Sequence, residues 1–248
     1  MNLVKNKNSQ LLCRAAFTLA ETLITIGIIG VVSALTIPNL INNYRAHKLR
    51  SQFLKSYSTI QQAFKQMEAD DVSLDPSDYR FVTHNKLFYK TFMNYLNTPF
   101  DCSDNTTSKR YLPCYSFARD NTFEYKDAGY KTLDGKNKAK ESYFDDGQIA
   151  LQDGSLLLFQ DSMVPPLVIS ISVDLNGYNN LPNRWGYDLF TFQFVEGEIK
   201  VMGEKGTTFT NLDKYCNKNS SNELNGIACA YKAKNDSDYF KSIIKDFK

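Results

Sequence analysis

One carboxylate interrupts a long apolar stretch near the start of the chain. From Phe17 to Ile37 the only ionisable side chain is that of Glu21. At ~1.5 Å rise per residue, a helix over this run is long enough to cross a ~30 Å hydrocarbon core. An acid inside a spanning helix costs roughly 2.5 to 3.5 kcal/mol and usually faces a partner, not lipid. We therefore expect Glu21 to pair with a positive charge.

Cleavage of the chain would supply such a charge. The small residues Ala15 and Ala16 precede the apolar run, so a cut before Phe17 would leave the anchor attached and expose a new α-amino group. In a neighbouring copy shifted by about one helical turn, that group would lie at the depth of Glu21. The alternative is an uncleaved signal anchor whose Glu21 reaches the lipid headgroups.

The segment AFTLAETLITIGIIGVVSALTIPNL resembles the prepilin cleavage and methylation segment of type IV pilins and type II secretion pseudopilins. A basic leader ends in Ala16, where the family usually has Gly. Phe17, Thr18 and Glu21 then follow at the family's spacing, and Pro38 is the twenty-second residue after the cut. The resemblance implies cleavage before Phe17, N-methylation of Phe17, and recognition of another subunit's N-terminus by Glu21.

The resemblance also implies a role and a location, although its motif covers only about the first forty residues. The role is that of a structural subunit of a type IV pilus or a type II secretion pseudopilus, with no enzymatic activity. The implied partners are prepilin peptidase, other pilin or pseudopilin subunits, the inner-membrane assembly platform and membrane lipid. The chain would cross the bacterial inner membrane once, keep its C-terminal domain extracytoplasmic, and then enter a filament.

Composition and charge limit the other possible partners. The chain has 248 residues, of which 42% are hydrophobic and 23% charged, enough for one globular domain beside an anchor. Three of its 29 basic residues and none of its 27 acidic residues lie in the first sixteen positions, so the remainder is near neutral. Nucleic acid is therefore not the default partner. We expect a leader at 1–16, an assembly helix at 17–41 and a globular domain at 42–248.

Four of the five cysteines lie outside the leader, at Cys102, Cys114, Cys216 and Cys229. An even number of cysteines is typical of an oxidising compartment. Three pairings are possible, and closeness in sequence favours 102 with 114 and 216 with 229; free buried thiols are the alternative. Many pilin-like proteins close a C-terminal loop with a disulfide, and the last pair resembles it in place. No C-x-x-C or paired histidine indicates zinc.

One loop carries candidate ligands for a cation. Asp174, Asn176 and Asp188 lie in VDLNGYNNLPNRWGYDLF, and oxygen ligands of this kind suit Ca²⁺. The loop lacks a closing Glu, and these residues also form ordinary turns. No other cofactor is expected, and His47 and His84 are interpreted as surface residues.

No hydrolase, phosphate-loop or zinc-protease motif is present. Two alternatives to a filament subunit remain open. One is a membrane-tethered extracytoplasmic binding domain that does not polymerise, and the other is an anchored hydrolase.

Periodicity predicts the elements that hold these residues. After Pro38, which we expect to kink or loosen the helix, apolar residues recur every three or four positions until about Ala69. They are Leu49, Phe53, Tyr57, Ile60, Phe64 and Met67. Asp70, Asp71, Asp75 and Pro76 should end this helix. A second helix is expected over residues 85–96.

Residues from Asp145 onward predict strands. Two apolar runs flank Asp153 and Gly154, a dipeptide typical of hairpin turns. A half-buried strand is expected at residues 167–173, and two more flank Gly197. Four or five antiparallel strands should form a meander against the second half of the long helix. The predicted fold is α+β, with a membrane half and an amphipathic half of one helix, the latter packed on the sheet, as in pilins.

Overall fold

The computed structural model describes residues 18–79, 87–102, 113–115, 129–161 and 167–247. It divides into two units, residues 1–43 and residues 44–248. The helix α1, Leu19–Ala69, contributes its first half to one unit and its second half to the other. Each unit has its own chemical character and is described separately.

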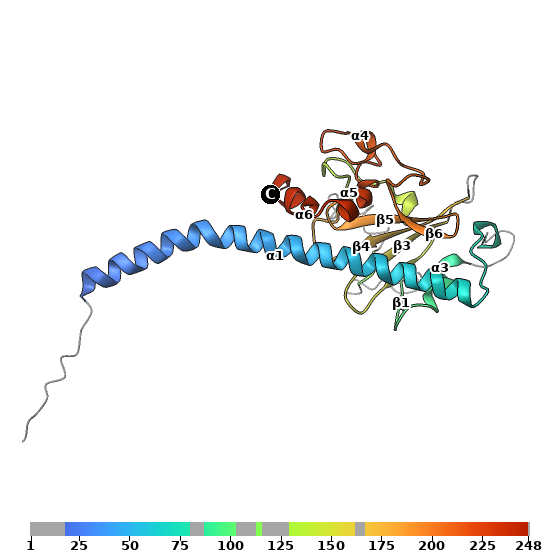
Figure 1. The fold of residues 1–248 in the computed structure, drawn as a ribbon, viewed down its shortest axis with the longest axis horizontal. Coiled ribbons are helices and arrows are strands. Elements are labelled where there is room, and N and C mark those ends of the chain that lie inside the picture. Colours follow the sequence, from blue (N-terminus) through green and yellow to red (C-terminus); the bar gives the residue numbers. More distant parts are fainter. Residues whose placement is uncertain (1–17, 80–86, 103–112, 116–128, 162–166, 248) are drawn as a thin grey trace, which may run out of the picture. The chain divides into compact units, whose positions relative to one another are not determined.

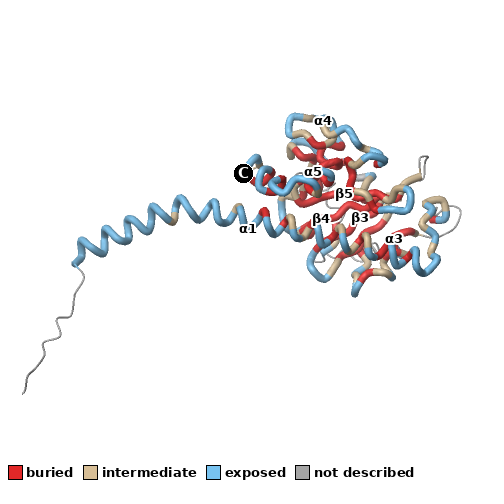
Figure 2. Tube along the Cα trace, viewed as in Figure 1, coloured by how far each residue is buried: buried red, intermediate tan, exposed pale blue. Residues whose placement is uncertain are grey.

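The first half of α1 is apolar and uncovered. Its large apolar residues are all exposed, and the tube in Figure 2 is pale blue over almost all of this half. By length and hydropathy this is a helix able to cross a membrane, and none of its most apolar window is buried in the described chain. A core helix of a globular protein would be mostly buried, so this half fits a membrane anchor.

The second half of α1 packs against the sheet through the predicted stripe. Five of its six members are buried, and Tyr57 is partly buried with its hydroxyl donating to Ile199 O at 3.2 Å. The helix ends at Ala69, as expected. Asp71 then adopts a positive φ of 53°, and Val72 N–H donates to Met67 O at 2.9 Å, which closes the last turn.

A six-stranded antiparallel meander forms the sheet, with its strands in sequence order (Figure 1). The strands are β1 Phe100–Asp101, β2 Gln148–Ala150, β3 Leu156–Asp161, β4 Ile169–Asp174, β5 Leu189–Val195 and β6 Glu198–Val201. The five strands β2 to β6 confirm the expected meander. The two-residue β1 was not predicted, because so short a segment has no detectable alternation.

Both predicted hairpin turns are present. Gly154 has a φ of 87° in the turn between β2 and β3, where Gly154 N–H donates to Leu151 O at 3.0 Å. Glu196 and Gly197 both have positive φ, 51° and 86°, between β5 and β6. Two successive positive φ values match the right-handed twist of the flanking strands, which is why this turn suits a two-residue hairpin.

The prediction that β4 is half-buried is wrong. All six of its residues are buried, because the sheet is covered on both faces. Ile169, Ile171 and Val173 join the core under α1. Ser170 and Ser172 face the other side, where a second core contains these residues: Phe144, Leu156, Leu158, Trp185, Leu189 and Met202. The Ser172 and Thr191 hydroxyls are hydrogen bonded at 2.8 Å, and Trp185 Nε1–H also donates to Thr191 Oγ1.

Short helices complete the globular unit. They are η1 Pro76–Tyr79, α3 Phe88–Met93, η4 Glu141–Tyr143, α4 Leu212–Tyr215, α5 Cys229–Asn235 and α6 Tyr239–Asp246. The helix expected over 85–96 is shorter than predicted, since residues 94–96 form a turn and residues 85–86 lie outside the described ranges. No helix was predicted for α5 or α6, although Phe240 and Ile244 have the i, i+4 spacing of a helical face.

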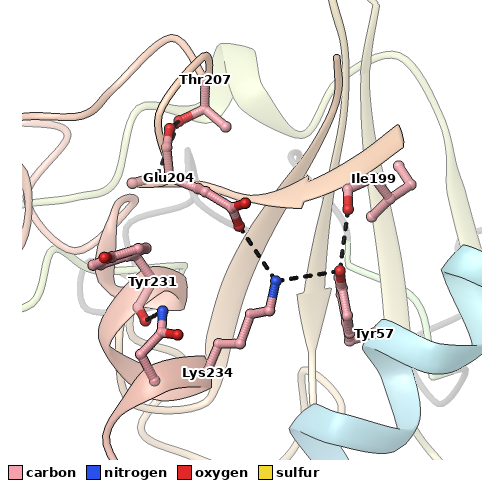
Figure 3. Close-up of polar contacts among 8 residues, drawn as sticks. Tyr57, Ile199, Glu204, Thr207, Tyr231 and Lys234 are labelled. Carbon is pink, nitrogen blue, oxygen red and sulfur yellow. Dashed lines mark hydrogen bonds and ion pairs between the residues drawn. The ribbon is translucent and has the colours of Figure 1, made fainter. Parts of the chain in front are cut away.

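One polar cluster joins α1 to α5 and to the loop after β6 (Figure 3). Lys234 Nζ lies 3.3 Å from Glu204 Oε2 and 3.4 Å from the Tyr57 hydroxyl, and 5.0 Å from the centre of the Tyr57 ring. Thr207 Oγ1–H donates to Glu204 O at 2.7 Å and so fixes the loop. The side chains of Lys234 and Glu204 are about one-third exposed, so their ion pair contributes little to the free energy of folding. We interpret the cluster as fixing the position of α5 beside α1.

We predict that Phe53→Ala lowers the free energy of unfolding by about 3 to 5 kcal/mol. Phe53 is fully buried and its ring centre lies 5.0 Å from that of Phe190 and 6.0 Å from that of Phe240. Urea unfolding of the full chain in detergent, followed by the fluorescence of the buried Trp185, would measure it. Leu54→Ala, at a 41% exposed neighbour, is the control and should cost less than about 1 kcal/mol. Equal losses would show that α1 does not anchor the core through Phe53.

Candidate functional site

The structure begins α1 with a reciprocal cap made by Thr18 and Glu21. Thr18 N–H donates to Glu21 Oε2 at 2.8 Å, and Glu21 N–H donates to Thr18 Oγ1 at 3.2 Å. The Thr18 hydroxyl also donates to Glu21 Oε2, at 2.9 Å. This is the capping box of a Thr-x-x-Glu sequence, which satisfies two amide groups that a helix start leaves unpaired.

The cap gives Glu21 a role that the sequence analysis did not assign. The T-L-A-E spacing ahead of an apolar run was the signal that predicts it. All the hydrogen bonds that the Glu21 carboxylate accepts within the described part of the chain go to Oε2. Oε1 therefore remains available to a group from outside the chain.

The surface around Glu21 is apolar along the whole first half of α1. Leu19 is 79% exposed and Leu35 76% exposed, and the large apolar side chains between them are exposed too. Burial of such side chains is worth roughly 1.5 to 3 kcal/mol each, so this surface has a strong tendency to enter lipid or to pack on other helices. Within the described ranges, no other element covers it.

Pro38 lies inside α1 and does not end it. Because proline has no N–H, the carbonyl of Ala34 loses its usual donor at this turn. Two residues before Pro38, Thr36 Oγ1–H donates to Val32 O at 2.9 Å. The helix thus continues through the position where the sequence predicted a loosened turn.

The cysteines form two disulfides, Cys102–Cys114 and Cys216–Cys229. This is the pairing favoured by closeness in sequence, and the structure does not contain the free thiols weighed as the alternative. Cys229 is the first residue of α5, and Lys232 Nζ donates to Cys216 O at 3.1 Å. The second disulfide therefore fixes the start of α5 to the loop that follows α4. Two disulfides are compatible with an extracytoplasmic domain.

The loop between β4 and β5 brings two predicted calcium ligands together in the interior. Asp174 and Asp188 are both fully buried, and Leu175 N–H donates to Asp188 O at 2.8 Å. Asp174 accepts from the Tyr130 hydroxyl at 2.9 Å and from Gly177 N–H at 2.9 Å. Every one of these bonds orders the loop.

Asp188 is held in the same way from the other end of the loop. Its Oδ1 accepts from Arg184 N–H at 2.7 Å, and its Oδ2 accepts from Asn183 N–H at 3.0 Å. Together with the donors to Asp174, these bonds occupy all four carboxylate oxygens. Tyr130, Asn183 and Arg184 were not identified from the sequence, since their contacts arise only after the loop folds onto the second core.

Burial and mutual repulsion disturb the acidity of this pair. Burial, with the charge of Asp188 nearby, raises the pKa of Asp174 well above its usual 3.8. Burial also raises the pKa of Asp188, to about 6, against the opposing effect of its backbone donors. Either a proton or a bound cation would offset the repulsion between the two carboxylates.

The oxygen atoms around the pair fit a calcium ion in part. Asn176 Oδ1 and Asn183 Oδ1 are buried and have no hydrogen-bond partner in the part of the chain that the structure describes. Amide and carboxylate oxygens are the ligands that Ca²⁺ prefers, but it needs six to eight of them. The ion would share carboxylate oxygens that already accept hydrogen bonds. Calcium at Asp174, Asn176 and Asp188 therefore stays a prediction, with Asn183 as an added candidate.

The remaining predicted residues are not part of a shared site. Ala16 and Phe17, where cleavage is expected, and His84 lie outside the described residues. His47 is exposed on α1. Across the described ranges no group of three or more His, Cys, Asp or Glu side chains could hold a metal ion. Glu21 and the aspartate pair belong to different units and are treated as separate sites.

Comparisons with models of known protein families, with curated proteins and with solved structures found no match to this chain.

We predict that the folded protein loses stability as pH rises from about 4 to about 7 in the presence of a chelator. The pKa of Asp188 is about 6 when folded and near 3.8 when unfolded, so in this range the folded chain holds protons that the unfolded chain has released. The effect is on the order of 2 to 3 kcal/mol. Asp174→Asn should flatten this fall, because it removes the carboxylate whose pKa burial and the charge of Asp188 raise, while the amide oxygen can still accept Gly177 N–H. Urea unfolding at a series of pH values measures it.

The control for this experiment is Asp146→Asn. Burial raises the pKa of Asp146 to about 6 as well, but Asp146 accepts its bond from Asp161 N–H and lies on another loop. Asp146→Asn should remove only the part of the pH dependence that Asp146 itself contributes. An unchanged slope in Asp174→Asn would show that the pair does not share a proton.

Repeating the urea series with Ca²⁺ tests whether the loop binds calcium. Stabilisation of the native chain but not of Asp174→Asn would support a calcium site, and no stabilisation would contradict it.

Proposed function

We propose that this chain is the structural subunit of an extracytoplasmic filament of the type IV pilus or type II secretion pseudopilus kind. The observation that carries the proposal is the first half of α1, an apolar helix without cover whose one acid, Glu21, lies in its first turn. Under this proposal, lipid covers the apolar surface of the helix before assembly. The apolar helices of other copies cover it in the filament.

The charge of Glu21 supports assembly with register. A carboxylate among packed apolar helices is destabilising unless a positive group lies beside it. An α-amino group at Phe17 of another subunit would be such a group, and only an axial offset of about one turn would bring it level with Glu21. Pairing would then select one offset between neighbours. Prepilin peptidase would create this group, and the inner-membrane assembly platform would raise the subunit into the filament.

The globular unit would form the outer surface of the filament. An amphipathic helix half covering an antiparallel sheet is the layout that the pilin resemblance leads us to expect, and both disulfides suit a compartment outside the cytoplasm. Within this proposal the sheet and its loops supply no catalysis. The alternative is a membrane-tethered extracytoplasmic binding domain that does not polymerise, in which case Glu21 serves only as a helix cap.

We predict that the chain isolated from membranes begins at N-methylated Phe17. The small side chain of Ala16 leaves room for a peptidase at the edge of the apolar segment, whereas Ala16→Leu should block the cut and retain the leader. Intact mass and N-terminal sequencing measure both. A native chain that keeps residues 1–16 in cells that contain prepilin peptidase would remove the main support for the proposal.

We predict that Glu21→Gln lowers incorporation into sheared filaments by at least about tenfold while the amount in the membrane stays the same. Glutamine can still accept Thr18 N–H, so the cap is kept, but it cannot neutralise an α-amino group, and an unpaired buried charge costs several kcal/mol. The measurement is the amount of subunit in sheared and membrane fractions, with the mass of each variant checked for cleavage.

Thr18→Ala is the matched control. It keeps the carboxylate and removes the hydroxyl that bonds Glu21, at a cost of about 0.5 to 2 kcal/mol to the helix start. We expect near-normal incorporation. Normal incorporation of Glu21→Gln would contradict charge pairing, and an equal loss in both variants would show that the cap, not the charge, is required.

A further inference from the structure

A small basic patch begins three residues after Ile41, the last exposed aliphatic residue in the first half of α1. It consists of Tyr44, Arg45 and Lys48, all on the exposed side of α1, and is called the interfacial patch below. Positions three and four apart lie on the same helix face, so Lys48 lies next to both other members. Ala46 and Leu49, which are buried, face the globular core instead. Tyr44 is 67% exposed although it is a large aromatic residue.

The two cations of the interfacial patch lack acidic partners. Neither Arg45 nor Lys48 forms a salt bridge with any residue in the described ranges. The neighbouring Arg50 donates to the backbone carbonyl of Asp236 at 3.2 Å. The acids at the turn between α5 and α6 are engaged as well.

One of these acids accepts a hydrogen bond from a backbone amide, and the other pairs with a lysine. The Asp236 carboxylate accepts from Asp238 N–H at 2.8 Å, and Asp238 pairs with Lys241 at 3.0 Å. Among the described residues, no acid therefore forms an ion pair with the positive charges of the interfacial patch. Lysine and arginine so exposed attract anions from the surroundings.

The position of Arg45 and Lys48 along the helix indicates that these anions are lipid phosphates. At ~1.5 Å per residue, Tyr44 follows Ile41 by ~5 Å and Lys48 by ~10 Å. The headgroup layer is about 5 to 8 Å thick on each side of the hydrocarbon core, and lysine and arginine reach several Å back along a helix. Tyrosine is itself enriched at this level of a bilayer. Arg45 and Lys48 thus come level with lipid phosphates when the apolar segment spans the core.

We propose that the interfacial patch binds the phosphate groups of anionic phospholipids in the leaflet on the C-terminal side of the membrane span. Binding there fixes the depth of α1 and places residue 44 at the water boundary. The inference rests on the membrane anchor alone and does not require a filament.

The test uses the full chain in phosphatidylcholine vesicles that contain a trace of spin-labelled phosphatidylglycerol or spin-labelled phosphatidylcholine. Electron paramagnetic resonance measures the fraction of each label that the protein immobilises. One exposed basic side chain at a bilayer surface is worth about fivefold in anionic lipid association at low salt. After screening at about 0.1 M salt, we expect at least about threefold preference for phosphatidylglycerol. Arg45→Gln with Lys48→Gln should bring the preference close to one.

Lys65→Gln with Lys90→Gln is the control, since both lysines are exposed, form no salt bridge in the described ranges and lie far along the chain from the span. It removes the same charge and should keep the preference. Equal association of both labelled lipids with the native chain, or an equal loss in the control, would overturn the proposal. If the native chain shows no preference but Arg45→Gln with Lys48→Gln reduces filament yield, the patch faces another subunit and lipid binding is wrong.

Discussion

The structure depends on one helix whose apolar side chains meet two different surroundings. In the second half of α1, Phe53, Ile60 and Met67 are fully buried against the sheet of the same chain. In the first half the same kinds of side chain find no partner in the described chain. Apolar burial is worth roughly 25 cal/mol per Å², so a helix that leaves this much surface open requires lipid or other helices to cover it. The capping box lies at the start of the uncovered half, and the interfacial patch follows its end.

The second half of α1 is stable in its place because the sheet has two cores, not one. Aromatic side chains of β5 pack under α1, with ring centres of Phe53 and Phe190 5.0 Å apart. The opposite face is closed by Trp185, Phe144 and the loop that contains the buried aspartates. That loop can bury two carboxylates only because backbone amides and the Tyr130 hydroxyl donate to them. The sheet is packed on both faces within the globular unit, whereas the anchor half of α1 has no such cover among the described residues.

Much of this arrangement could be read from periodicity, and the rest depended on contacts distant in sequence. The stripe from Leu49 to Met67, the hairpin at Gly154 and the strands β2 to β6 follow from local patterns that tertiary packing did not override. The burial of Ser170 and Ser172 did not follow, because polar residues predict a solvent face and only the folded loops cover them. The α5 helix, which begins at Cys229, was not predicted, because the cysteine spacing indicates only a disulfide-closed loop and carries no helix signal. At Glu21 an unusual environment hid a common capping motif.

The cap that Glu21 forms and the register role that we propose for it would use different properties of one side chain and so would not compete. The cap needs hydrogen-bond acceptance at Oε2, which an amide oxygen supplies equally well. The proposed register would need a full negative charge, which would matter little at a wet membrane edge and become decisive only when water is removed. Under this proposal, a subunit alone in the bilayer could keep a stable helix start with an unpaired carboxylate near the headgroups. Packing against other copies would raise the energy of that charge until an amino group came level with it, and this rise would favour one offset over all others.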